Sequence, residues 1–143
     1  MADKLFNLLR YFPLFGVARA MKIVIKIGGS VIASPLNPEL ILQYCRVLNS
    51  LKAGGHQIVV VVGGGNVARE FISIAGRLGL SDIDKDEIAI LVSRLNAQLI
   101  ARALGENSSV EIPSTVSQVS KLLAKGKIVV LGVLKPGITT DTV

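Results

Sequence analysis

From residue 21 onward, short apolar runs rich in Val and Ile alternate with stretches whose apolar positions recur every three or four residues. Residues 22–27 predict a strand, and the unbroken apolar run 57–62 predicts a strand buried on both faces. Further strands are predicted at residues 110–112 and 127–131. Strand and helix in repeated succession predict an α/β fold, with a doubly wound, mainly parallel sheet between two layers of helices.

The helices predicted between these strands have recognisable ends. Asn37 followed by Pro38 predicts a helix start, with the Asn side chain as N-cap, and Gly54 ends that helix. The remaining helices are expected at residues 66–78, at residues 84–104, and from a cap at Ser114 to just before Gly126. Helix 84–104 has an acidic first turn, which suits the positive end of a helix dipole. Its apolar stripe is wide enough to be a core face packed on the sheet.

Composition and charge limit which classes of partner the chain is expected to bind. Its 143 residues are enough for one domain, and the 50% that are apolar can form a sizeable core. The net charge of +6 would suit nucleic acid. Because Lys and Arg are scattered without interleaved aromatic residues, we instead favour a solvated surface with a few phosphate-binding cations and no nucleic-acid partner. The single cysteine, Cys45, excludes a disulfide scaffold and fits a reducing, cytoplasmic compartment.

The first twenty residues differ from the rest of the chain. Ala18-Arg19-Ala20 resembles a signal-peptide cleavage site, but Arg10 and Pro13 interrupt what would be the apolar segment. An interfacial amphipathic anchor is a second interpretation. We favour an upstream translational start or a cloning extension, because a complete-looking protein begins at Met21. No other stretch approaches the ~20 continuous apolar residues that span a bilayer, so we expect no membrane partner.

Three of the four predicted strands end in glycine-rich or polar segments, and ligands bind at this edge of parallel sheets. Gly28-Gly29-Ser30 follows the first strand, and Lys26 lies just before it. Glycines let backbone N–H groups approach an anion, and a lysine in a buried strand needs an anionic partner. The alternative for Lys26 is a solvent-facing edge strand, since Lys22, Val24 and Lys26 alternate to one side. We favour a phosphate.

The second segment, Gly63-Gly64-Gly65, joins a buried strand to a helix and places several N–H donors at the helix N-terminus. Arg69 follows one turn into that helix, where its guanidinium can close over a phosphate. The segment is neither a P-loop nor a dinucleotide-binding fingerprint. The third segment contains a Pro136-Gly137 turn followed by Thr139-Thr140-Asp141, which can cap a helix or bind a polar ligand.

Taken together, residues 26–30, 62–69 and 136–141 resemble the amino-acid kinase family in order and spacing. Ser93-Arg94-Leu95-Asn96-Ala97 further resembles the archaeal uridylate kinases of that family. The resemblance covers residues 21–143, which it identifies as an acceptor-binding domain of the three-layer α/β fold, with residues 1–20 an extension of unknown role. It also implies that an ATP-binding half would begin where this sequence stops.

The resemblance implies transfer of the γ-phosphoryl group of ATP to UMP with Mg²⁺, giving UDP in pyrimidine nucleotide biosynthesis. It implies a cytoplasmic hexamer, with part of helix 84–104 facing a partner subunit, and an inactive 143-residue chain. Lys26 and Arg69 would be the catalytic cations. The resemblance assigns Gly29, Ser30, Gly65 and Arg69 to ATP and the transferring phosphoryl group, and Gly64, Asp86, Leu134, Lys135, Pro136, Gly137, Ile138, Thr139 and Thr140 to UMP. Val133 stands where the family often has glycine, and its side chain would crowd the base pocket.

Two other functions are compatible with the sequence. One is a non-catalytic relative on the same fold that stores an oxyanion such as molybdate or tungstate. The other is a small oxyanion- or nucleotide-binding module with no second half. Arg69 and Thr139-Thr140-Asp141 favour the kinase.

Overall fold

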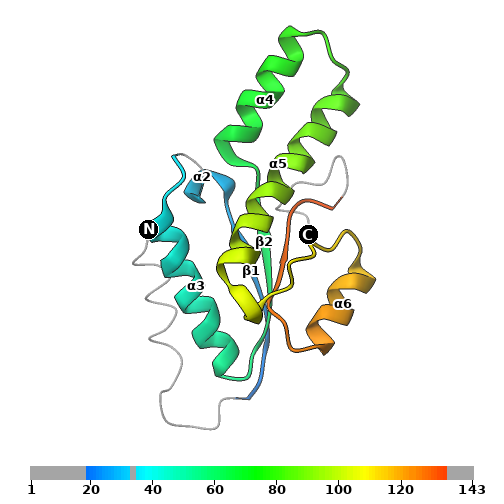
Figure 1. The fold of residues 1–143 in the computed structure, drawn as a ribbon. Coiled ribbons are helices and arrows are strands. Elements are labelled where there is room, and N and C mark those ends of the chain that lie inside the picture. The colour runs from blue at the N-terminus through cyan, green and yellow to red at the C-terminus, as the bar shows by residue number, and fades with distance from the viewer. Residues whose placement is uncertain (1–18, 33–34, 135–143) are drawn as a thin grey trace.

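The computed structural model describes residues 19–32 and 35–134, which form a parallel three-stranded sheet surrounded by helices (Figure 1). The strands, in spatial order, are β1 (Lys22–Ile27), β2 (Gln57–Val62) and β3 (Val129–Leu131). The helices are α2 (Gly29–Ile32), α3 (Pro38–Ala53), α4 (Gly65–Arg77), α5 (Asp82–Ala103) and α6 (Val116–Ala124), with a 3-10 turn, η1, at Gly105–Asn107. The predicted α/β class and parallel sheet are confirmed.

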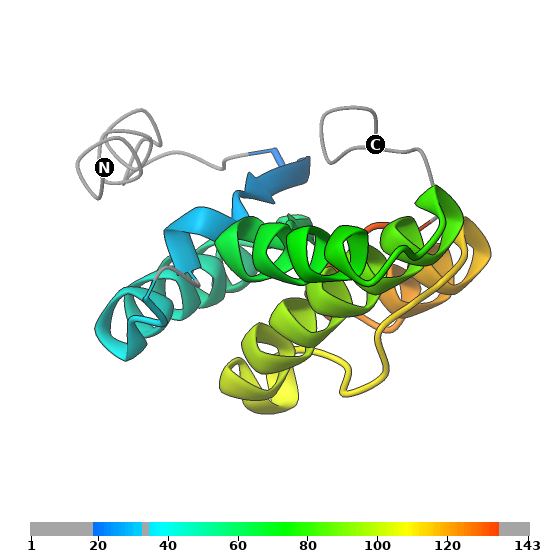
Figure 2. The ribbon, with the colours of Figure 1, turned by 90° about the horizontal axis from the view of Figure 1, so that it is seen from above.

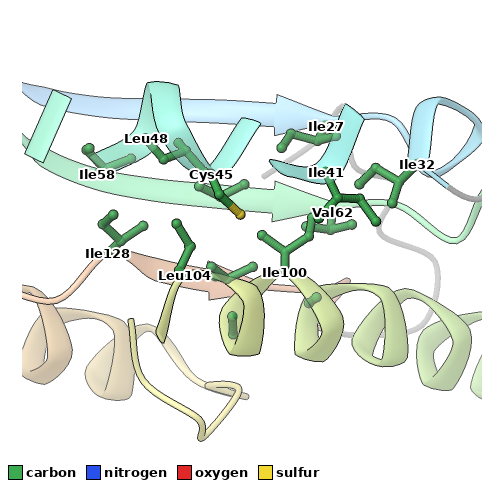
Figure 3. Packing of buried hydrophobic residues seen from close by; sticks show 14 of the residues in the cluster. Ile27, Ile32, Ile41, Cys45, Leu48, Ile58, Val62, Ile100, Leu104 and Ile128 are labelled. Atoms are coloured by element: carbon green, nitrogen blue, oxygen red, sulfur yellow. The ribbon is translucent and has the colours of Figure 1, made fainter. Parts of the chain in front are cut away.

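Helices cover both faces of the sheet. The main core lies on one face, where β2 packs against α3 and α5 (Figure 3). Its members from these three elements are Ile58, Val60, Val62, Ile41, Cys45, Leu48, Leu51, Ala97, Ile100 and Ala101. On the other face, Val61, Val129 and Leu131 form a second cluster against α6. The central strand β2 is therefore buried on both sides, as its unbroken apolar run predicts.

The helix α3 begins where its sequence predicts. The side-chain oxygen of Asn37 accepts a hydrogen bond from the backbone N–H of Leu40 at 3.0 Å, and Pro38 occupies the first helical position. Proline is well suited to that position, because its missing N–H would have no intrahelical partner there.

The helices α4 and α5 form an antiparallel pair beyond the carboxyl ends of the strands. Figure 1 shows α4 rising from the end of β2 and α5 returning past the sheet, and the view from above shows the two in contact as they cross (Figure 2). α5 thus passes the ends of β2 and β3 on its way to the main core.

One predicted strand and several predicted boundaries need correction. Residues 110–112 form no strand, and the only pairing here is an isolated bridge between Ser108 and Ile128. The cap of α6 is Thr115 rather than Ser114, because the Thr115 side chain accepts the N–H of Gln118. α5 starts at Asp82 instead of residue 84, and β3 is shorter than residues 127–131.

The face of β1 that carries Lys22, Val24 and Lys26 is exposed, and Val24 retains 65% of its accessible surface. α6 packs on this side of the sheet over the cluster formed by β2 and β3. Among the described residues, no helix is both long and apolar enough to cross a membrane. Of the predicted N-terminal extension, residues 1–18 lie outside the described part of the chain.

Candidate functional site

The glycine-rich segments that follow β1 and β2 meet backbone to backbone. A Cβ atom on Gly29 would lie 2.2 Å from the amide nitrogen of Gly65 and 2.4 Å from the carbonyl oxygen of Gly63. A Cβ atom on Gly65 would in turn lie 2.3 Å from the carbonyl carbon of Gly29. Such distances leave no room for any side chain, so the contact depends on glycine at both positions.

Gly65 is also the first residue of α4, and its φ of +64° is in the left-handed region that favours glycine. The first N–H groups of an α-helix have no intrahelical partner and carry the positive end of the helix dipole. The N-cap residue, Gly64, provides no side-chain hydrogen bond to them. The N-terminus of α4 therefore lies beside the ends of β1 and β2, and a helix N-terminus is a place where an anion can bind.

Arg69 links the two glycine-rich segments. Its Nη2 donates a hydrogen bond to the Ser30 hydroxyl oxygen at 3.0 Å, and the same nitrogen donates to the side-chain oxygen of Asn66. The guanidinium consequently lies across the start of α4 and the segment after β1. A planar group with several N–H donors in this place can hold phosphate oxygens through charge-assisted hydrogen bonds. The structure thus brings together Gly29, Ser30, Gly64, Gly65 and Arg69.

Lys26 lies in β1, one residue before its end, with its Cα opposite that of Val61. Its side chain is exposed, on the side of the sheet that α6 covers only over β2 and β3. The expectation of a lysine in a buried strand is therefore wrong, because β1 is an edge strand of the described sheet and its face with Lys22, Val24 and Lys26 is exposed to solvent. Asp86 is exposed in the second turn of α5. It lies one turn before Ala89, whose carbonyl oxygen would be 3.6 Å from a Cβ on Gly64. Lys26 is therefore three residues before Gly29 in the chain, and Asp86 is one helical turn before a residue whose backbone approaches Gly64.

The predicted uridine segment is described only at its first residue. Leu134 is half-buried and packs against the cluster of Val61, Val129 and Leu131. Residues Lys135, Pro136, Gly137, Ile138, Thr139 and Thr140 lie outside the described residues.

Two buried polar side chains of α5 contact this site, and the sequence analysis gave neither of them a role. The Asn96 amide nitrogen donates to the carbonyl oxygen of Gly63 at 2.9 Å and, more weakly, to that of Gly64 at 3.4 Å. The Ser93 hydroxyl accepts the N–H of Val133 at 3.0 Å and donates to the Ile90 carbonyl at 2.8 Å. Polar residues on the buried side of a helix are the signal that could have revealed them, since such groups need partners.

The shifted pKa values belong to groups outside this cluster. Burial raises the pKa of the Cys45 thiol and of the Tyr44 phenol, both in α3. Hydrogen bonds from Ser81 lower the pKa of Asp84 at the start of α5. Across residues 19–32 and 35–134, no three His, Cys, Asp or Glu side chains gather into a group that could hold a metal ion.

Comparison with known proteins identifies the family. The model of the amino acid kinase family matches residues 21–143. The chain belongs to the amino acid kinase family. Over 123 residues it is 42% identical to the uridylate kinase of Methanosarcina mazei and 46% identical to that of Methanococcoides burtonii. Each alignment covers 86% of this chain but 52% of the relative, so the chain spans about half the length of the curated relatives it matches.

Solved structures of the family agree with this fold. The chain superposes on the uridylate kinase of Archaeoglobus fulgidus with a TM-score of 0.76 and 35% identity, over 82% of this chain and 53% of that one. The UMP kinase of Ureaplasma parvum gives a TM-score of 0.71 at 22% identity, covering 86% of this chain and 60% of that one. The second similarity concerns the fold alone. The predicted family and fold are confirmed.

Proposed function

We propose that this chain is the acceptor-binding part of a uridylate kinase, a nucleoside monophosphate kinase that transfers the γ-phosphoryl group of ATP to UMP and forms UDP. The observation that carries the proposal is the contact of Gly29 with Gly65 beside Arg69. It puts a helix N-terminus and a guanidinium at one place, which suits a phosphate group. The relatives named uridylate kinase support UMP as the acceptor, and a role in pyrimidine nucleotide biosynthesis is part of the proposal.

In this proposal, the two glycine-rich segments hold different phosphates. Gly64, before the first turn of α4, binds the phosphate of UMP, while Gly29, Ser30 and Lys26 bind the phosphoryl group in transfer and its ATP side. Gly65 and Arg69 lie between donor and acceptor. Phosphoryl transfer needs little covalent chemistry from the protein, so these groups would act by alignment and by neutralising the charge on the oxygens in the transition state.

The nucleoside would lie on the side of α5. Asp86 is proposed to accept hydrogen bonds from the ribose hydroxyls, because it is exposed and lies one helical turn before Ala89, whose backbone carbonyl approaches Gly64. Residues 134–140 are proposed to bind the uracil base. The Mg²⁺ of the reaction is proposed to come bound to ATP.

We further propose that these 143 residues alone do not phosphorylate UMP. The groups assigned here handle the acceptor and the phosphoryl group in transfer, and none of them forms an adenine pocket. Holding donor and acceptor in line contributes roughly 7–11 kcal/mol to lowering such barriers. A coupled assay on the purified chain should give no UDP above background. UDP formation that Lys26→Ala abolishes would show that this part of the proposal is wrong.

Calorimetry with three ligands tests the proposed acceptor. The chain should bind UMP more tightly than AMP or molybdate. Arg69→Ala should weaken UMP binding by roughly 1.5–3 kcal/mol, the range for a charge-assisted hydrogen bond. Arg77→Ala is the matched control, because Arg77 is exposed in the last turn of the same helix. Heat from molybdate without heat from UMP would support the oxyanion-storage function instead, and equal UMP affinity in both variants would remove Arg69 from the site.

A further inference from the structure

We infer that Ser93 and Asn96 are positioning residues that set the distance between the phosphate and the base of the nucleotide. Asn96 holds the phosphate loop, defined as Gly63–Gly65, and Ser93 holds the base segment, defined as residues 132–134, which leads to and includes Leu134, the first of the residues proposed to bind the uracil base. The inference rests on the proposed function, and it gives α5 a role that neither the family match nor the named relatives assign.

Asn96 orients the amides of the phosphate loop. Its side chain is 6% exposed and donates to the carbonyl oxygens of Gly63 and Gly64. In a trans peptide the C=O and the following N–H point in opposite directions. Two carbonyls turned toward α5 therefore turn the N–H groups of Gly64 and Gly65 away from it. These are the amides that the proposal places on the phosphates.

Ser93 fixes the start of the base segment in the same way. Its side chain is 1% exposed, and its hydroxyl accepts the N–H of Val133. A Cβ on Gly132 would lie 2.7 Å from the Ser93 hydroxyl oxygen and 2.8 Å from the amide nitrogen of Arg94. The backbone of the segment thus lies directly against α5, and only glycine fits at its first residue.

The two attachments are one helical turn apart. Residues at i and i+3 share a face of a helix, and a rise of 1.5 Å per residue separates them by about 4.5 Å along the axis. Since one rigid helix holds both loops, the offset between them cannot change unless a hydrogen bond breaks. We infer that a nucleoside monophosphate contacts both loops, with its phosphate at one loop and its base at the other.

A purely structural role would make a different prediction. Gln98, on the same helix, donates to the carbonyl oxygen of Val110 at 2.8 Å, a bond of the same type that ends on a loop away from the strand ends. If hydrogen bonds from α5 only stabilise the fold, losing any of them should weaken all ligands alike. If Ser93 and Asn96 position separate parts of one nucleotide, each loss should affect a different part.

The experiment measures affinities for UMP, inorganic phosphate and uridine, by NMR titration of the ¹⁵N-labelled 143-residue chain. Asn96→Ala should weaken phosphate and UMP about tenfold and leave uridine within twofold, a tenfold change corresponding to about 1.4 kcal/mol. Ser93→Ala should weaken uridine and UMP and leave phosphate within roughly twofold, the smaller effect of a neutral hydrogen bond being about three- to tenfold. Gln98→Ala should change none of them. Exchange of the Val133 amide with solvent should become faster only in Ser93→Ala.

Equal losses for phosphate and uridine in both variants, or losses matched by Gln98→Ala, would overturn the inference and leave the proposed function standing. Wild-type protein that does not bind UMP would instead contradict the proposed function. If Asn96→Ala does not fold, Asn96→Leu, which has a similar volume and no donor, takes its place under the same criteria.

Discussion

At the scale of single residues, the site depends on the absence of side chains. Gly65 meets two separate demands, a left-handed φ of +64° and a backbone contact with Gly29 that leaves no space for a Cβ. Gly126 meets only the first, since its φ is +70° and nothing lies within 4 Å of its Cβ position. Substituting each glycine therefore separates two contributions to the free energy of unfolding: that of the left-handed backbone conformation and that of the backbone contact.

Gly126→Ala should lower the free energy of unfolding by about 1–2 kcal/mol, the cost of placing alanine in the left-handed region. Gly65→Ala should lower it by a further amount of about 1–3 kcal/mol, because the methyl group must displace the backbone of the segment after β1. Urea unfolding measures both values. Equal costs would mean that the two glycine-rich segments are not in contact.

At the scale of elements, the first residues of α5 stabilise the helix, whereas residues in its middle contact the proposed site. It begins with a capping box in which the Ser81 hydroxyl accepts the N–H of Asp84 and the Asp84 carboxylate accepts the N–H of Ser81. The hydroxyl also donates to that carboxylate at 2.6 Å. These bonds stabilise the ionised form of Asp84 and lower its pKa.

This pKa shift predicts a pH dependence of stability. Because the folded pKa of Asp84 is depressed, its stabilisation is fully present above the unfolded pKa, near 4, and is lost as pH falls through the folded value. The melting temperature of the wild type should exceed that of Asp84→Asn at neutral pH, and the gap should narrow below about pH 4. Glu87→Gln, which removes an exposed charge from the same helix, is the control. A gap that is constant with pH would contradict the role of the carboxylate.

The elements and their glycine-rich ends could be predicted because each depends on a local pattern. The strands β1 and β2, the cap at Asn37 and the loop before α4 all follow from neighbouring residues. The strand predicted at residues 110–112 is wrong because side chains of α5, rather than a neighbouring strand, form hydrogen bonds with the backbone of this segment. Arg94 donates to the carbonyl oxygens of Ile112 and Pro113, and Gln98 donates to that of Val110.

The hydrogen bonds from Asn96 and Ser93 to the segments after the strands also join residues that are far apart in the sequence. The motif that contains both residues was recognised, but nothing local shows that an amide in mid-helix reaches the carbonyl of Gly63. The start of α5 was predicted two residues too late, because its capping box has Asp84 in the position usually taken by Glu or Gln.

At the scale of the whole molecule, the paired helices leave apolar side chains uncovered. The predicted stripe of α5 divides, because Val92 and Ile100 are buried whereas Leu91 and Leu95 remain 65% and 68% exposed. The exposed large apolar residues of α4, its C-cap and α5 are Phe71, Ile74, Leu78, Ile83, Leu91, Leu95 and Leu99. Packing on the core therefore explains only part of the apolar stripe of α5. The exposed part is of the kind that marks interaction surfaces in other proteins.

We expect this surface to support assembly of the protein, as the hexamer that the family resemblance implies would require. Light scattering at micromolar concentration should give a mass above that of the monomer. Changing Leu91 and Leu95 together to Glu should reduce it, because the new charges would have to be desolvated at an interface. The matched control changes Val116, which is exposed on α6, to Glu. A monomeric mass for the unaltered protein would contradict the expectation.

The most direct test of the central claim is to map the amides that respond when UMP is added to the ¹⁵N-labelled chain. If the phosphate binds at the meeting of the two glycine-rich segments, the resonances of Gly29, Ser30, Gly64 and Gly65 should shift in a saturable way. Those of Gly105 and Gly126, which have open surroundings beyond the ends of α5 and α6, should stay in place. Saturable shifts that leave Gly64 and Gly65 unchanged would contradict the account.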